Sequence, residues 1–392
     1  MSEALRRRID EIVGSQIHSS GPRSAVVGVR VPRCDFEHTA AAGIARADTN
    51  RPASGSDRFH VASVGKMFTA VLITRAASEG RFGPRGVDAV LSEIDAIPRD
   101  LVAAIHPEGH SISLRHLLTH TSGMKDNVVD DATGTASELG SPPPGSLISR
   151  YTRSVAAIRN GRTDDGFARH RWKPWDPDHL GEPMVGTLND FITSGTAANP
   201  VALPGEKFHY SDTAFVLLGV VLELVTGRRY HELQREQILN PLGLVDTTMA
   251  YCETTSSVRE GEMDVWFGSV PLVSEGFDLS FDWGGGGQVS TVADLLTFLA
   301  AVLDPASGII SPRFPLTQWS EPAGLSAPRR GVGLGLLQWE AGGRVVTGHA
   351  GAWGVRVFHD PQTDAWLAGT VNEQNACAWM ADIFAAVEQE LR

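Results

Sequence analysis

The segment FHVASVGKMFTAVLITRA, from Phe59 to Ala76, is the part of the sequence that most strongly indicates the fold of the chain. Its apolar residues recur with the period of a helix that buries one face: Met67, Phe68, Val71 and Leu72. Ser63 and Lys66 lie three positions apart at the front of this helix, so both project from the same face. A buried helix gains nothing from an amine in its first turn. Lys66 therefore either extends to water or acts on Ser63.

The spacing of Ser63 and Lys66 suits nucleophilic chemistry. A serine hydroxyl is a poor nucleophile until a neighbouring base takes its proton. Lys66 is a candidate base if burial or a nearby cation lowers its pKa. Backbone N–H groups at the start of the helix would also stabilise a developing oxyanion. The alternative is a serine that caps the helix beside a lysine that reaches solvent, and this spacing alone does not separate the two.

Tyr210 lies in a second candidate segment, HYSD at positions 209–212, directly before a strongly apolar helix that we expect to end at Gly227. A phenol near a lysine ionises more readily and can pass a proton to a leaving group. The alternative is a tyrosine at a packing interface, with Ser211 or Asp212 as a helix cap.

The third candidate segment is TGHAGAWG, positions 347–354, where short strands are expected. A glycine in a strand often marks the close approach of a ligand or of another backbone. His349 and Gly351 would then line one wall of a cleft, with the backbone N–H of Ala352 as an oxyanion donor facing that of Ser63. A tight turn with a half-buried histidine is the alternative.

Composition narrows the class of protein. The chain has 392 residues, of which 42% are apolar and 20% charged, enough apolar material for a sizeable core. Its formal net charge of −12 argues against nucleic acid or an anionic membrane surface as a partner. Three distant cysteines fit neither a disulfide framework nor a metal-binding spacing: Cys34, Cys252 and Cys377. We see no apolar leader and no run of about 18 apolar residues, so we expect a cytoplasmic protein without a membrane span.

The order of expected elements suggests two parts. Two antiparallel strands over 24–33 and 36–48 precede a mostly helical middle, and several short strands and a helix follow it. We therefore predict an α/β domain formed by residues 1–62 and 250–392, and a mostly helical lobe over 63–249. Residues 125–200 are rich in turn signals and read as a long loop-rich insertion with short helical pieces. A ligand would bind between the two parts.

Taken together, the three segments form the series S-x-x-K, Y-x-x and H-x-G. With the flanking phrases SLRHLLTHTSGM and GGGGQVSTVADLLTFL, they resemble the serine β-lactamase and penicillin-binding-protein superfamily over roughly residues 5–390. The chain is most similar to its class C β-lactamase-like branch, which includes D-aminopeptidases and amidases, family VIII carboxylesterases and nylon-oligomer hydrolases. The resemblance implies an α/β (α+β) fold in which an antiparallel sheet flanked by helices is joined to an all-helical lobe.

The resemblance also implies roles for individual residues. Ser63 would be acylated, Lys66 would activate it, and Tyr210 would pass a proton to the leaving group and help to activate water. The backbone N–H groups of Ser63 and Ala352 would form the oxyanion hole. The substrate would be a small ester or amide, no metal or other cofactor would be needed, and the oligomeric state stays open.

Two positions depart from the family pattern. His349 replaces the lysine of K-T-G, and a largely neutral imidazole holds a carboxylate weakly. Asp212 replaces the asparagine of Y-x-N; an ionised aspartate donates no hydrogen bond, and pairing with Lys66 would raise the pKa of that lysine. Both departures favour a carboxylesterase or amidase with weak or no β-lactamase activity. An acyltransferase and a non-catalytic penicillin-binding-like sensor are the alternatives.

Aromatic and glycine-rich segments complete the candidate site. Trp353 is expected to bind substrate, as are Asp212, His349 and Gly351. Four tryptophans are candidates for the wall of an apolar acyl or alcohol pocket: Trp172, Trp175, Trp283 and Trp353. The segment DWGGGG at positions 282–287 is expected to bring its backbone close to the cleft.

Overall fold

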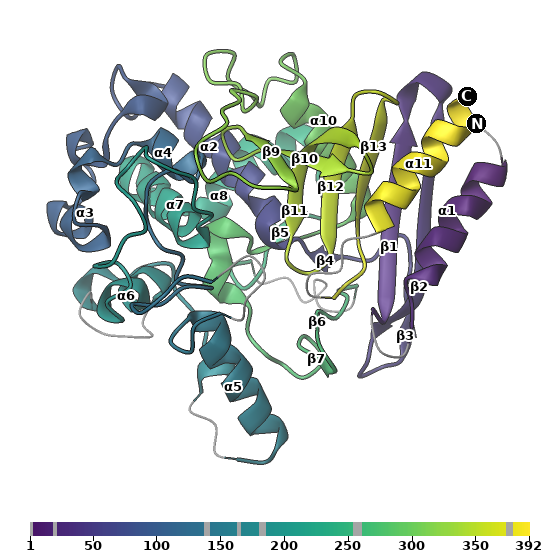
Figure 1. Ribbon diagram of the computed structural model, residues 1–392, viewed down its shortest axis with the longest axis horizontal. Helices are drawn as coiled ribbons and strands as arrows, with labels where there is room; N and C mark the ends of the chain where they lie inside the picture. The colour runs from purple at the N-terminus through teal and green to yellow at the C-terminus, as the bar shows by residue number, and fades with distance from the viewer. Residues whose placement is uncertain are drawn as a thin grey trace.

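The structure is a computed structural model that describes residues 3–18, 22–136, 142–162, 166–179, 186–253, 261–373 and 379–392 (Figure 1). Its α-helices are α1 (Glu3–Ser15), α2 (Lys66–Ser78), α3 (Arg99–Ile105), α4 (Leu114–Leu118), α5 (Leu147–Arg159), α6 (Thr187–Thr193), α7 (Asp212–Thr226), α8 (Tyr230–Gln234), α9 (Asn240–Leu242), α10 (Val292–Leu303) and α11 (Trp379–Leu391). Its strands are β1 (Ser24–Val31), β2 (Phe36–Arg46), β3 (Arg51–Pro52), β4 (Phe59–His60), β5 (Thr248–Met249), β6 (Trp266–Phe267), β7 (Val270–Pro271), β8 (Gln288–Ser290), β9 (Arg329–Val332), β10 (Leu337–Ala341), β11 (Arg344–Gly351), β12 (Val355–Asp360) and β13 (Ala365–Thr370).

Both ends of the chain contribute to one large sheet. Its eight strands have the order β3-β2-β1-β13-β12-β11-β10-β9, and every neighbouring pair is antiparallel. The pairing of β1 with β13, which sets Val27 opposite Gly369, joins the N-terminal hairpin to the C-terminal strands. The predicted antiparallel sheet shared by the two ends of the chain is therefore confirmed.

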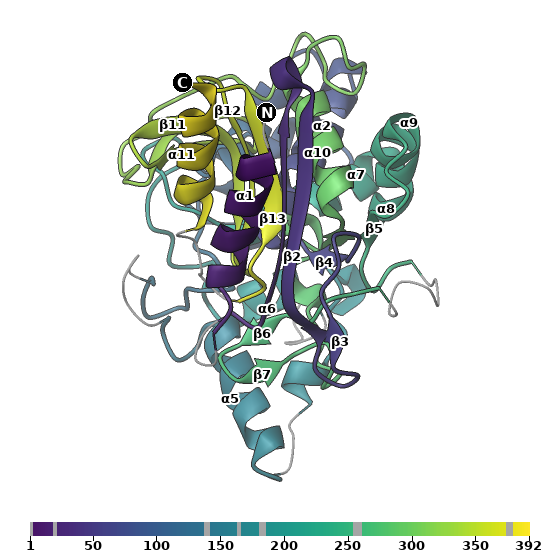
Figure 2. The same ribbon diagram turned by 90° about the vertical axis from the view of Figure 1, so that its right-hand side faces the viewer.

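Helices cover both faces of this sheet (Figure 2). On one face, α1 buries the apolar residues that recur along it at helical spacing: Leu5, Ile9, Ile12 and Val13. These residues pack with α11 and the strands in one buried cluster. On the other face, α10 packs closely because Gly28 of β1 has no side chain; a Cβ there would come within 2.1 Å of the Val292 side chain.

The middle of the chain forms the helical part (Figure 1). Helix α7 ends as predicted, because Gly227 takes a φ of 67°, in the left-handed region that suits glycine. The boundaries expected near residues 62 and 250 stay a prediction. A single cluster of buried side chains runs across both, and it includes Val26 in β1, Leu117 in α4 and Leu295 in α10.

The segment 125–200 is more ordered than its turn signals predicted. It contains the 13-residue helix α5 as well as α6. Helix α5 forms because four apolar residues lie on one face at helical spacing, and all four are buried: Leu147, Ile148, Tyr151 and Val155. The expectation of only short helical pieces is therefore wrong for α5. Within this segment, residues 137–141, 163–165 and 180–185 lie outside the described residues.

The junction between β1 and β13 gives a test of the fold. A Cβ on Gly369 would lie 2.4 Å from the backbone oxygen of Val26. We therefore expect Gly369→Ala to lower the free energy of unfolding by about 1–3 kcal/mol, because two paired strands would have to separate. Guanidinium unfolding followed by circular dichroism measures this change.

Gly14 provides the matched control for this test. It lies exposed in α1, and no atom would lie within 4 Å of a Cβ there. We expect Gly14→Ala to raise the free energy of unfolding by up to about 1 kcal/mol, because alanine favours a helix. Equal effects of the two substitutions would contradict the close approach at Gly369.

Candidate active site

Ser63 lies in a tight turn between strand β4 and helix α2. The turn is a 3-10 helix, Ala62–Gly65, and α2 begins only at Lys66. Ala62 takes a φ of 47°, which a residue with a side chain rarely adopts. Such a conformation persists only where its surroundings determine it. This turn presents Ser63, which is 8% exposed, to a cavity.

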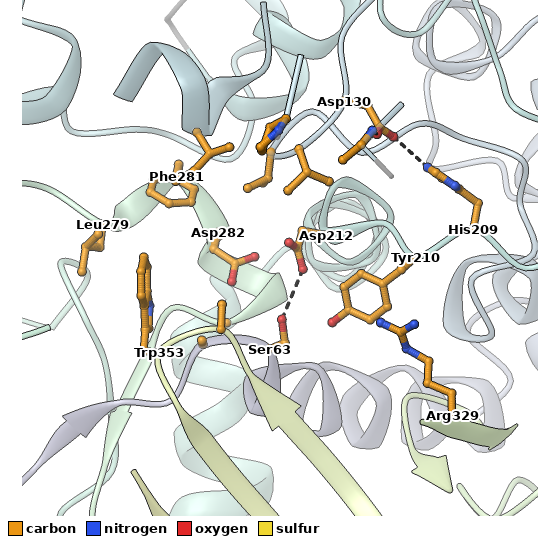
Figure 3. Close-up of a pocket in the computed structure, with 18 of the residues that line it drawn as sticks. Ser63, Asp130, His209, Tyr210, Asp212, Leu279, Phe281, Asp282, Arg329 and Trp353 are labelled. Atoms are coloured by element: carbon orange, nitrogen blue, oxygen red, sulfur yellow. Dashed lines mark hydrogen bonds and ion pairs between the residues drawn. The ribbon is translucent and has the colours of Figure 1, made fainter. Parts of the chain in front are cut away.

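The Lys66 side chain is fully buried and has three hydrogen-bond acceptors. Its Nζ donates to Ser63 Oγ over 3.1 Å, to the Gly285 carbonyl oxygen over 2.8 Å, and to Asp212 Oδ1. The Ser63 hydroxyl in turn donates to Asp212 Oδ1 over 3.4 Å (Figure 3). Serine, lysine and aspartate thus form a closed triangle of hydrogen bonds.

The charges around Lys66 keep it protonated. Burial lowers the pKa of its amine, but the Asp212 carboxylate opposes burial and the net shift is upward. Lys66 is therefore an ammonium that donates to Ser63 Oγ, and it has no lone pair with which to take the serine proton. The predicted pairing of Asp212 with Lys66 is present. The role of free base that the resemblance implied for Lys66 stays a prediction, and it would require release of the amine from Asp212.

Tyr210 lies beside this triangle. The centroid of its ring is 5.2 Å from Lys66 Nζ, and the ring stacks on His120 at a centroid distance of 4.2 Å. Burial raises the pKa of Tyr210, and its interactions with Lys66 and Ser63 offset only part of this rise. The phenol is therefore neutral at physiological pH, and its hydroxyl has a proton to give.

His349 lies behind Tyr210 and is not part of the cavity wall. It is 1% exposed, and its ring centroid is 6.3 Å from that of Tyr210. Its Nδ1 bonds to the Ala350 carbonyl oxygen over 2.8 Å, and because a carbonyl only accepts, Nδ1 carries the proton. Burial, followed by the charge of Lys66, lowers the pKa of His349 to about 3. His349 is thus an uncharged group near Tyr210 and outside the cavity wall, and its expected contact with substrate stays a prediction.

Gly351 is likewise absent from the cavity wall, but it brings the strand to the serine. A Cβ on Gly351 would lie 2.5 Å from the Val61 backbone oxygen, so only glycine allows β11 to approach the turn so closely. The next two residues, Ala352 and Trp353, do line the cavity beside Ser63. This arrangement suits the expected use of the Ala352 N–H as an oxyanion donor.

The glycines after Asp282 have a similar effect. A Cβ on Gly286 would lie 2.5 Å from the backbone of Ala62, and a Cβ on Gly65 would lie 2.8 Å from Gly286 Cα. The expectation that this segment brings its backbone close to the site is confirmed. The same approach places the Gly285 carbonyl oxygen on Lys66.

The cavity has a volume of about 600 Å³ and is lined by both parts of the chain. Its lining includes Ser63, Val128, Asp130, Ile148, His209, Tyr210, Asp212, Leu279, Phe281, Asp282, Arg329, Ala352 and Trp353. In Figure 3, Trp353, Phe281, Leu279 and Asp282 lie on one side of Ser63, and Tyr210, Arg329 and His209 lie on the other.

Several of these residues are not among those predicted from the sequence. Asp282 belongs to the glycine-rich segment but was not singled out, because its neighbours suggested only backbone approach. His209, whose Nε2 bonds to Asp130 over 2.7 Å, directly precedes Tyr210 and was also passed over. Arg329 carried no motif; its guanidinium lies 5.5 Å from the ring centroid of Tyr210.

Only one of the four candidate tryptophans lines the cavity, and it is Trp353. Trp283 packs against the ring of Tyr230 at a centroid distance of 4.9 Å, and Trp172 packs against Phe167. Trp175 borders a separate surface groove. A large apolar indole packs well in a protein core, and most of the four tryptophans serve that purpose. The expected cavity wall of tryptophans is therefore reduced to Trp353.

The described part of the chain contains neither a metal-binding cluster nor a membrane-spanning helix. Among the residues that the structure describes, no group of three or more His, Cys, Asp or Glu side chains is placed to hold a metal ion. No helix in the described ranges is long and apolar enough to cross a membrane. Cys34 and Cys252 are free thiols, and Cys377 lies outside the described residues.

The buried His349 gives a test of the electrostatics. A histidine with a lowered pKa in the folded state takes up a proton more readily when unfolded, so acid favours unfolding. We expect the free energy of unfolding to fall as pH falls from about 6.5 to about 4.5, with His349 contributing roughly 2–3 kcal/mol. In His349→Gln this contribution disappears, which urea unfolding at several pH values measures.

His110, whose side chain is 66% exposed, provides the control. We expect His110→Gln to keep the pH dependence of the unmodified chain. If His349→Gln also keeps the original pH dependence of the free energy of unfolding, the fold does not hold the His349 imidazole neutral.

Comparison with known proteins supports the same architecture. A D-aminopeptidase from Brucella anthropi is 25% identical over 354 residues, which make up 87% of this chain and 54% of that protein. The chain thus spans about half the length of this curated relative. The D-amino acid amidase from Ochrobactrum anthropi SV3, complexed with L-phenylalanine amide, matches with a TM-score of 0.68 at 19% identity, and 100% of both chains is covered. EstCE1, a hydrolase with promiscuous acyltransferase activity, matches with a TM-score of 0.68 at 20% identity, with 98% of each chain covered.

The structural matches show a shared fold, and the family assignment comes from the sequence. The sequence model of the Beta-lactamase family matches residues 23–383. That range takes in Ser63, Lys66, Tyr210 and His349, and it covers most of the 392 residues. The chain therefore belongs to the Beta-lactamase family.

Proposed function

We propose that this protein is a serine hydrolase that forms a covalent acyl-enzyme on Ser63 and cleaves a small ester or amide. One observation carries the proposal: Ser63 Oγ lies 3.1 Å from the buried Lys66 Nζ and 3.4 Å from Asp212 Oδ1, at a cavity of about 600 Å³. The D-aminopeptidase, the D-amino acid amidase and the hydrolase EstCE1 among its relatives support this reaction class.

The acylation step follows from the protonation states in the site. Ser63 Oγ bonds to the substrate carbonyl carbon while its proton passes to Asp212 Oδ1, the carboxylate that already accepts that hydrogen bond. The Lys66 ammonium stabilises the oxygen as it loses the proton. The carbonyl oxygen becomes an oxyanion, for which the backbone N–H groups of Ser63 and Ala352 are the proposed donors.

Tyr210 has the complementary role in the later steps. When the tetrahedral intermediate collapses, the bond to the leaving group breaks, and the leaving group takes the proton of the neutral Tyr210 hydroxyl. The phenolate, next to Lys66, then takes a proton from the water that attacks the acyl-enzyme. Ser63 recovers its own proton from Asp212 as the acid departs, so the protonation of the site is restored.

The site favours substrates other than β-lactams. His349 is uncharged and lies behind Tyr210, so it offers no cation to a β-lactam carboxylate. Asp212 accepts hydrogen bonds where an asparagine of the family would donate one to the substrate carbonyl. We expect nitrocefin turnover to be slow or absent, which an absorbance assay measures. Rapid nitrocefin hydrolysis would show that neither position excludes β-lactams.

Acyl transfer is a second candidate function, supported by the acyltransferase activity of EstCE1. The same Ser63 acyl-enzyme would then be attacked by an alcohol or amine in place of water. Product partition with an added alcohol distinguishes the two, since a transferase gives mainly the new ester. A non-catalytic sensor would show no turnover of any substrate.

A panel of p-nitrophenyl esters and of D- and L-amino-acid p-nitroanilides tests the proposal directly. We expect a fluorophosphonate probe to label Ser63, and Ser63→Ala to lose both labelling and turnover. If Ser63 is not labelled, or if Ser63→Ala turns over every substrate at the original rate, the protein is not a serine hydrolase of this kind.

The role of Asp212 gives a sharper test of the mechanism. We expect Asp212→Asn to slow acylation of Ser63 about a hundredfold or more, because the proton acceptor is lost. Burst kinetics with a p-nitrophenyl ester measure this step. An acylation rate equal to or above that of the unmodified chain would identify Lys66, once released from the ion pair, as the base.

A further inference from the structure

One carboxylate on the cavity wall is not used by the mechanism above. Asp282 lies in the turn Ser280–Gly285, and its side chain faces the cavity near Ser63 (Figure 3). Its Oδ1 is buried and accepts no hydrogen bond from the described residues. The residue as a whole is partly exposed at the cavity, so only this oxygen is removed from water without a partner, and a buried acceptor of that kind calls for an explanation. Because Asp282 lines a substrate cavity, the simplest explanation is that the carboxylate binds a cationic group of a ligand.

The backbone holds Asp282 in this position. A Cβ on Gly285 would lie 2.1 Å from Asp282 Oδ1, and a Cβ on Gly286 would lie 2.2 Å from Oδ2. The carboxylate therefore packs directly against the backbone of the two glycines. Any side chain at either position would occupy the space of a carboxylate oxygen. Gly286 also packs against the backbone of Ala62, so the carboxylate is fixed relative to the turn that bears Ser63.

No Lys, Arg or His side chain among the described residues forms an ion pair with this carboxylate. Lys66 is the cation that acts on it, but the hydrogen bonds of Lys66 go to Ser63, Asp212 and Gly285. The other titratable groups that interact with Asp282 are the Asp212 carboxylate and the Tyr230 phenol. Burial and the charge of Asp212 together raise the pKa of Asp282 to about 7, although Lys66 opposes them.

The surroundings of Asp282 show what kind of cation would fit. The apolar side chains of Trp353, Phe281 and Leu279 lie on the same side of Ser63 as Asp282 (Figure 3). Arg329 lies on the opposite side of Ser63, near Tyr210, where it would repel a second cation. This distribution favours a ligand group that combines an apolar body with a positive charge.

We propose that Asp282 binds a protonated amine on the acyl group of the substrate, while Trp353, Phe281 and Leu279 contact the apolar side chain of the same acyl group. The proposal builds on the proposed function, in which Ser63 is acylated. It assigns the substrate to amides or esters of amino acids with an apolar side chain. Tyr210 and Arg329 then face the leaving group.

The pH dependence follows from the two charges. Binding requires an ionised Asp282, so affinity for the amine falls as pH drops through about 7 and the carboxyl gains a proton. It falls again as the amine loses its proton above about pH 8. An uncharged ligand of the same shape lacks this dependence.

Binding to Ser63→Ala tests the proposal without any need for turnover. Isothermal titration compares both enantiomers of phenylalaninamide with 3-phenylpropanamide, which has the same body without the amine. At about pH 7.5 we expect one enantiomer of the amine to bind roughly tenfold or more tightly than 3-phenylpropanamide, and this ratio to shrink at about pH 5.5. The pH comparison uses the original Asp282 and so does not depend on the folding of a variant at that position.

Two substitutions in the Ser63→Ala chain complete the test. Asp282→Asn is expected to abolish the preference for the amine, and Asp95→Asn, which removes an exposed charge outside the cavity, is expected to keep it. The proposal is overturned if phenylalaninamide binds no better than 3-phenylpropanamide, or if Asp282→Asn retains the preference. Labelling of Ser63 is measured separately, so an inert Ser63 with a clear amine preference would refute the proposed function alone.

Discussion

The buried ammonium of Lys66 is the interaction on which the rest of the site depends. Its three acceptors come from the serine turn, from the start of α7 and from the glycine-rich segment. These segments are far apart in the sequence, so the lysine fixes their relative positions. A buried charge is tolerated only when its partners are in place, and loss of one partner would leave the other charge uncompensated. The same contacts therefore order the serine, the aspartate and the backbone around them.

This arrangement also decides the protonation state of the site. With Asp212 at the position of the family's asparagine, the lysine stays charged and the nearest proton acceptor is a carboxylate. The tyrosine stays neutral because burial outweighs the effect of the nearby cation. The site at rest thus holds one proton acceptor beside the serine and one proton donor for the leaving group. In the proposed mechanism, a single aspartate in place of an asparagine moves the role of base from the lysine to the aspartate.

Much of the fold could be predicted from local patterns. Strands β1 and β2, helix α7 and its end at Gly227 followed from periodicity and from turn residues, because each depends on neighbours in the sequence. The length of helix α5 was not predicted, because the turn signals around it obscured the helical spacing of four apolar residues that are buried in the structure. Ser63 was placed in the helix, yet it lies in a turn before it, since the close approach of Gly286 and Gly351 shapes that turn.

The sequence by itself determined which chemical groups are present: a serine and a lysine three residues apart, a tyrosine before an apolar helix, and a histidine where the family has a lysine. Only the tertiary structure decided which of these groups meet and in what charge state. Packing buries His349 near Tyr210 and outside the cavity wall, and burial keeps it neutral. The same packing sets Asp282 beside Ser63, although 219 positions separate them in the chain. Distance, burial and charge depend on contacts between remote segments, and no local pattern specifies them.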